Sequence, residues 1–111
     1  MRRRKRLKDL DHLRRDIDRM GRLVARQLET AVDAFDRFDP ALADSVIEKD
    51  DLIDNLNLRV ESRSFEMAAH NDLSDGDYRA ARSALKVATN LEHAGDAATH
   101  ICKHIRIMQR E

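Results

Sequence analysis

The chain has 111 residues, which fits one domain and leaves too little for two ordinary ones. Three glycines, one proline and 4% aromatic residues argue against an all-β protein, while 38% charged residues favour long amphipathic helices. Lys and Arg total 21, as do Asp and Glu, so the balanced charge argues against a nucleic-acid binder or a membrane-surface binder. A single cysteine, Cys102, cannot form an internal disulfide, which favours a reducing, cytoplasmic location. No apolar run of about 18 residues is present, so we expect no membrane insertion.

The first predicted helix covers residues 7–38 and follows a basic extension over residues 1–6. Its apolar residues recur at steps of three or four, as on one face of a helix. They are Leu10, Leu13, Ile17, Met20, Val24, Leu28, Ala31, Phe35 and Phe38. The basic extension has the charge to bind nucleic acid or acidic lipid, but it lacks interleaved aromatic residues. We expect a solvated helix start there and no nucleic-acid binding.

The second predicted helix covers residues 40–70. Asp39 is a suitable N-cap residue for it, and Pro40 suits its first turn. The apolar stripe consists of Leu42, Val46, Ile53, Leu56, Val60 and Met67. The helix is expected to end in the polar, glycine-containing stretch AHNDLSDGDY, which is typical of a connection.

The third predicted helix covers residues 75–109. Ser74 and Asp77 resemble a capping box at its start, with Asp in place of the usual Glu. Its stripe consists of Tyr78, Ala81, Leu85, Ala88, Leu91, Gly95, Ala98, Cys102, Ile105 and Met108. Short connections make neighbouring helices antiparallel, so residues 7–111 predict one all-α domain, an antiparallel three-helix bundle of the up-down-up, spectrin-like kind. An extended hairpin that completes its core by dimerising is an alternative.

Two pairs of acidic residues, each spaced i, i+4, lie beside the apolar stripes of the second and third helices. They are Asp50 with Asp54 and Glu92 with Asp96. If these helices turn back on each other near residue 73, Asp50 lies level with Asp96 and Asp54 with Glu92. Four close carboxylates repel one another unless a cation neutralises them, and carboxylate oxygens suit hard cations such as Mg²⁺, Mn²⁺, Ca²⁺ or iron.

Two neighbouring residues bear on this metal-site hypothesis. Gly95 would let the facing helix approach closely. His100, four residues beyond Asp96, could add a nitrogen ligand, which would favour zinc or iron over magnesium. The plainer interpretation is that the acids pair with the abundant arginines in solvent, and that His100 is a solvated helix residue.

Three segments of the chain resemble the PhoU family of phosphate-signalling regulators. They are RMGRLVARQLETAVDAF, VIEKDDLIDNLNLRVE and DYRAARSALKVATNLEHAGDAATHICKHI. The family carries an acid-x-x-x-Asp motif on its second helix and Glu-Arg-Ile-Gly-Asp on its third. Asp50 and Asp54 match the first motif, and Glu92 and Asp96 match the second. The resemblance implies a PhoU-like three-helix fold that binds iron, zinc or another divalent ion, such as manganese or magnesium, on these carboxylates.

The chain also departs from the family pattern. His93 and Ala94 replace the Arg and Ile of the third-helix motif, Asn57 stands where a glutamate is frequent, and the family protein usually has two such units in tandem. The resemblance implies a non-enzymatic, metal-binding regulator of phosphate uptake and signalling. Its partners would be the ATPase of a phosphate ABC transporter and a sensor histidine kinase.

Three further expectations complete this interpretation. We expect a homodimer, in which a second copy replaces the missing tandem unit through off-stripe apolar residues. Those residues are Leu23, Leu52, Leu58, Leu73 and Ile107. A helical adaptor or oligomerisation module without a metal site is the alternative function. A metal-dependent phosphate-handling enzyme is a third, although the sequence offers it no base or nucleophile.

Overall fold

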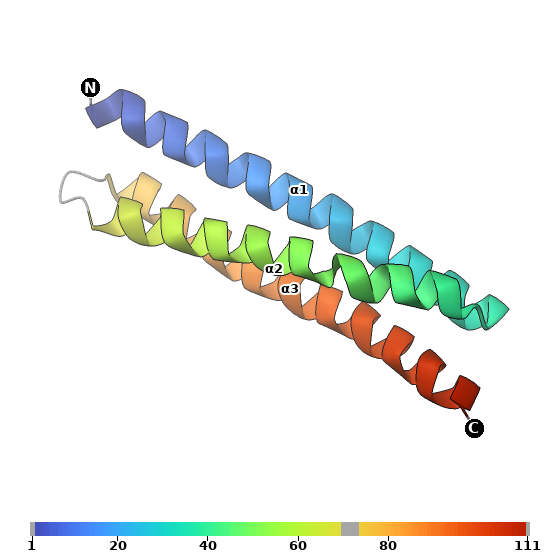
Figure 1. The fold of residues 1–111 in the computed structure, drawn as a ribbon. Helices are drawn as coiled ribbons and strands as arrows, with labels where there is room; N and C mark the ends of the chain where they lie inside the picture. The colour runs from blue at the N-terminus through green and yellow to red at the C-terminus, as the bar shows by residue number, and fades with distance from the viewer. Residues whose placement is uncertain (1, 70–73, 111) are drawn as a thin grey trace.

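Three long helices make up the fold in the computed structural model, which describes residues 2–69 and 74–110 and the side chains of residues 8–69 and 74–109. They are α1 (Arg2–Arg37), α2 (Pro40–Ala68) and α3 (Asp75–Arg110). The helices run side by side in alternating directions and form a rod of 59 × 17 × 17 Å (Figure 1). The predicted all-α, antiparallel three-helix bundle is therefore confirmed.

The helix ends follow from local hydrogen bonds. Asp39 caps α2 as predicted, because its side chain accepts hydrogen bonds from the backbone N–H groups of Ala41 (2.9 Å) and Leu42 (3.3 Å). At the start of α3, the hydroxyl of Ser74 accepts from the backbone N–H of Asp77 at 3.1 Å, as in a capping box. The largest difference from the prediction is at the N-terminus, where α1 already begins at Arg2.

A tight turn between α1 and α2 reverses the chain. Phe38 adopts a positive φ of 53°, a conformation more often taken by glycine. The N–H of Asp39 donates to the carbonyl of Ala34 (2.9 Å), and the N–H of Phe38 to that of Phe35 (3.2 Å). These two bonds form a Schellman motif, which satisfies the last carbonyls of α1 and starts α2 at once.

The core runs along the rod as two clusters of buried side chains. The cluster nearer the α2–α3 connection contains most of the large core residues, and the other contains more alanine. The first contains Leu13, Met20, Val24, Ile53, Leu56, Val60, Met67, Ala81 and Ala88, and the second Ala31, Ala34, Ala43, Val46, Ala98, Cys102 and Ile105. Burial raises the pKa of the Cys102 thiol, so that this residue acts as a small apolar core residue.

Four aromatic or apolar residues that the stripes placed in the core are exposed instead. Phe35 is 57% exposed and Phe38 is 44% exposed, and Tyr78 and Met108 also face solvent. The buried face of α1 runs through Gln27, Ala31 and Ala34, and the apolar stripe missed it because Gln27 is polar. Phe38 leaves the stripe because α1 has ended at Arg37. Our prediction was therefore wrong for these stripe ends.

Candidate metal centre

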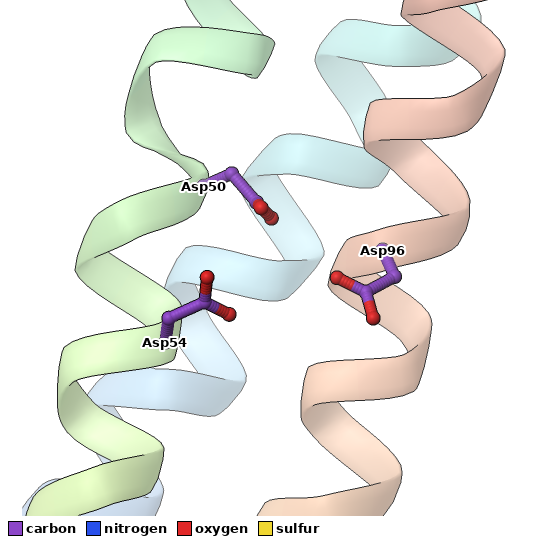
Figure 2. A group of neighbouring side chains, drawn as sticks. All are labelled: Asp50, Asp54 and Asp96. Carbon is purple, nitrogen blue, oxygen red and sulfur yellow. The ribbon is translucent and has the colours of Figure 1, made fainter.

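Three aspartates from two helices meet on one side of the bundle. Asp50 and Asp54 lie one turn apart on α2, and Asp96 lies opposite them on α3. One carboxylate oxygen from each lies within 4.8 Å of the other two. Figure 2 shows the three side chains pointing into the space between α2 and α3, with α1 behind them. The predicted register of Asp50 and Asp54 against Asp96 agrees with this placement.

The packing of α2 against α3 sets the position of these acids. Ile53 is 1% exposed and Gly95 is buried, and each directly precedes one of the aspartates in the sequence. A Cβ atom at Gly95 would lie 3.1 Å from Cδ1 of Ile53, which is tighter than an ordinary contact. The missing side chain thus lets the two helices approach closely. The next residues, Asp54 and Asp96, are consequently half-buried at the margin of the contact between α2 and α3, which we name the acidic seam.

Two polar side chains hold neighbouring carboxylates in place. The hydroxyl of Thr99 lies 3.1 Å from Oδ1 of Asp50 and 3.2 Å from the carbonyl oxygen of Gly95, so its proton can be donated to either acceptor. The amide of Asn57 donates a hydrogen bond to the carboxylate of Glu92. Sequence reasoning noted Asn57 only as a departure from the family pattern, and it missed Thr99. The signal for Thr99 was its position three residues beyond Asp96, on the same face of α3.

The charges at this site repel one another. Burial is the largest cause that raises the pKa of Asp54 above its usual value, followed by the charges of Asp50, Glu92, Asp96 and Asp51. Within the part of the chain that the structure describes, Asp50, Asp54, Glu92 and Asp96 make no ion pair with Lys or Arg. The solvated salt bridges of the plainer interpretation are therefore not observed for these four acids.

Glu92 and His100 lie outside the group of three converging aspartates. Glu92 is engaged by Asn57, yet its charge is near enough to raise the pKa of Asp54. His100 is exposed on α3. The observed set is therefore three carboxylates, with Glu92 at its edge.

The donor set fits a hard cation. Two oxygens on opposite sides of a Ca²⁺ ion, each at about 2.4 Å, are about 4.8 Å apart, and smaller ions need slightly shorter separations. The separation of the aspartate oxygens is within this limit. Small rotations of half-buried side chains would bring them onto one ion, and the remaining positions would be open to water or another carboxylate.

The chain is similar to proteins of one known family. The chain matches the PhoU domain model over residues 17–105. It is 30% identical over 104 residues to a phosphate-specific transport system accessory protein PhoU homolog of Clostridium acetobutylicum, covering 93% of this chain and 48% of that protein. It is 33% identical over 100 residues to the Caulobacter vibrioides homolog of the same name, covering 90% and 44%. The Aquifex aeolicus homolog is 30% identical over 104 residues, with 94% and 47% covered.

The chain spans about half the length of the curated relatives that it matches. No solved structure matches it. The names of these relatives describe an accessory protein of a phosphate-specific transport system. Among the described residues, no helix has the length and apolar character needed to cross a bilayer.

Proposed function

Because the chain belongs to the PhoU family, we propose that it is a metal-binding regulator of phosphate uptake and phosphate signalling that acts through contacts with other proteins. The observation that supports metal binding is the convergence of Asp50, Asp54 and Asp96 with no basic partner among the described residues. Carboxylates that repel one another in a half-buried seam are stabilised when a cation binds between them.

The three aspartates would hold the ion, and Glu92 would join them if its side chain exchanged the bond from Asn57 for the metal. Oxygen ligands favour magnesium, manganese or iron, and His100 would favour iron or zinc if it rotated toward Asp96. Bound metal would reduce the negative charge on this side of the bundle. A partner protein could therefore distinguish the loaded state from the metal-free state.

A metal titration of chelator-treated protein tests the site. We expect Asp54→Asn with Glu92→Gln to lower the affinity for the bound metal by at least about 100-fold while circular dichroism shows unchanged helicity. Glu48→Gln with Glu66→Gln is the matched control, because both acids are exposed on α2 outside the converging group. If the double variant still copurifies with stoichiometric metal, the metal-binding site lies elsewhere. If the parent protein binds none, the helical adaptor becomes the better interpretation.

The proposed partners are the ATPase of a phosphate ABC transporter and a sensor histidine kinase, in the cytoplasm. The relatives' names, which describe an accessory protein of a phosphate-specific transport system, support the transporter as a partner, and the kinase follows from the family resemblance alone. Binding of the purified ATPase and of the kinase's cytoplasmic domain, with and without metal, tests it. If the chain binds neither the ATPase nor the kinase domain, with or without metal, the assignment of partners is wrong.

We also propose a symmetric dimer. The three-helix unit leaves several large apolar side chains exposed, and a second copy would cover them. Leu52, Leu58 and Ile107 are exposed as expected, Leu23 is half-buried, and Leu73 lies outside the described residues. An additional apolar cluster unites the ends of α1 and α3, where a groove is lined by Val32, Phe35, Ile101, His104 and Met108.

Sedimentation equilibrium at micromolar concentration tests the dimer. We expect twice the 12.8 kDa mass of one chain, and a return to that mass in Phe35→Glu, because a buried unpaired charge is costly in an apolar interface. Arg37→Glu, a nearby exposed position, is the control. A mass of one chain for the parent protein, unchanged by metal, would contradict the dimer.

A further inference from the structure

A second surface, separate from the acidic seam, lies between α1 and α2. It is a groove of about 320 Å³. Four residues of each helix line it: Arg19, Arg22, Leu23 and Arg26 from α1, and Leu52, Asn55, Leu56 and Arg59 from α2. Both sets follow the spacing i, i+3, i+4, i+7, so each is one continuous face of about two helical turns. We name this surface the arginine groove.

The arginine groove combines an apolar floor with a basic rim. Leu56 is buried and Leu23 half-buried, while Leu52 is 50% exposed although it lies beside them. Leucines thus form a floor that is only partly covered by this chain. All four arginines of the groove are exposed at its rim.

The positive charge of the rim is only partly compensated. Arg22 pairs with Asp18 at 3.1 Å, but both side chains are largely in solvent, where such a pair is weak. Arg59 lies 3.6 Å from the buried Asp16. Arg19 and Arg26 make no ion pair with any carboxylate in the described ranges. Two guanidinium groups therefore remain available at the rim, seven residues apart.

We propose that the arginine groove docks an acidic amphipathic helix of a partner protein. A groove between two helices accepts the side-chain ridge of a third helix lying along it. Apolar residues of the incoming helix would cover Leu23 and Leu52, and its Asp or Glu residues would form paired hydrogen bonds with Arg19 and Arg26. The distance between these arginines, about two turns, matches acids placed seven residues apart on the partner.

The shape and chemistry favour a helix over other anions. A single small anion would engage one end of the rim and leave the leucine floor exposed. A nucleic-acid strand stacks its bases on aromatic side chains, and none lines this groove. The proposal rests on the part of the proposed function that has the protein act through protein contacts, but it does not depend on metal. Asp50 and Asp54 lie on the opposite side of α2 from the groove.

The test measures binding of the full chain to a synthetic helical peptide of about 18 residues. The peptide has Leu on one face and Glu on both flanks of that face. Fluorescence anisotropy measures binding, and ¹⁵N NMR shifts locate it. We expect micromolar binding that weakens with added salt, and shifts confined to residues 19–26 and 52–59. Arg19→Glu with Arg26→Glu should weaken binding by about tenfold or more. Arg79→Glu with Arg82→Glu changes the charge equally at exposed positions of α3 and should leave binding unchanged.

Several outcomes would overturn the proposal. The Glu peptide could fail to bind, or a peptide with Lys in place of Glu could bind equally well. The Arg19→Glu with Arg26→Glu variant could bind the Glu peptide as tightly as the parent protein does. A single-stranded oligonucleotide with the same net charge as the Glu peptide could bind the groove more tightly than that peptide. Self-association that blocks the groove, seen by sedimentation, would assign the surface to a second copy instead. Metal titration of the parent protein separates the two proposals. A parent protein that binds metal but not the peptide contradicts docking alone, and one that binds the peptide but no metal contradicts the metal site alone.

Discussion

The two sides of α2 carry opposite charge and are built differently. Toward α3 it presents Asp50 and Asp54, which lie beside a closely packed seam and have no basic partner in the described residues. Toward α1 it presents Leu52 and Arg59, which line an open groove. At about 100° of rotation per residue, these two sets lie nearly opposite on the helix. A chain with no net charge is therefore far from electrostatically uniform.

Repulsion between like charges lowers the stability of the acidic side, whereas ion pairs stabilise the basic side. On the α3 side, like charges face one another without compensation, which is typical of sites built for a ligand. On the α1 side, Arg59 and Arg63 pair with buried acids of α1 and hold the helices together. The acidic seam therefore lacks the ion pairs found on the basic side, which combines structural pairing with a free rim.

The largest expected effect concerns packing at the acidic seam. Gly95→Leu should destabilise the protein by about 1–3 kcal/mol, because even a Cβ atom there would lie 3.1 Å from Cδ1 of Ile53. Thermal unfolding measures this, and the melting temperature should fall by several degrees. Ala97→Leu, an exposed position on α3, is the control and should have little effect. A higher melting temperature for Gly95→Leu would show that the seam is not closely packed.

The next effect concerns the structural pairing on the basic side. Arg63→Ala should cost about 1–2 kcal/mol, because it removes the 3.2 Å partner of Asp9, which is buried, and leaves that carboxylate unsatisfied. Urea denaturation measures the loss. Arg22→Ala removes a solvent-exposed pair with Asp18 and should change stability by less than about 0.5 kcal/mol. Equal effects of the two variants would remove the distinction between structural and rim arginines.

A third prediction compares the closely packed Gly95 with a glycine in open space. Apart from its own helix backbone, Gly21 of α1 has no atom within 4 Å of the place its Cβ would occupy. Gly21→Ala should therefore stabilise α1 by about 0.4–1 kcal/mol, because alanine loses less conformational entropy on folding. The same substitution at Gly95 should lack this gain. A stabilisation of both variants by equal amounts, in thermal unfolding, would contradict the contrast in packing.

The smallest effect is the pH dependence of Asp54 in metal-free protein. Its pKa is raised above 3.8, so the folded state binds the proton more tightly than the unfolded chain does. Ionised Asp54 therefore destabilises the fold at neutral pH, and this penalty fades as the pH falls through the raised pKa and then below 3.8. Asp54→Asn should be more stable than the parent at about pH 7, with a smaller difference near pH 3.8. Urea denaturation at both pH values measures this, and a pH-independent difference would contradict it.

The sequence predicted the helices well because their signals are local. The stripe spacing, Asp39 before Pro40, and Ser74 before Asp77 all concern residues within one turn of each other. The level of Asp50 and Asp54 against Asp96 was also predictable, since antiparallel helices joined by a short connection leave little freedom in register. Phe35 was misplaced because the buried face of α1 includes the polar Gln27, which a stripe of apolar residues passes over, and continues to Ala34.

By itself, then, the sequence determined three helices, their antiparallel order and the pairing of the acids along the rod. Only the tertiary structure decided that Asn57 binds Glu92, that Thr99 reaches Asp50, and that arginines of α1 share a leucine floor with α2. Periodicity fixes which residues share a face of one helix, but the rotation of that helix against its neighbours depends on how all three pack. Side chains on different helices come together only once that packing is set.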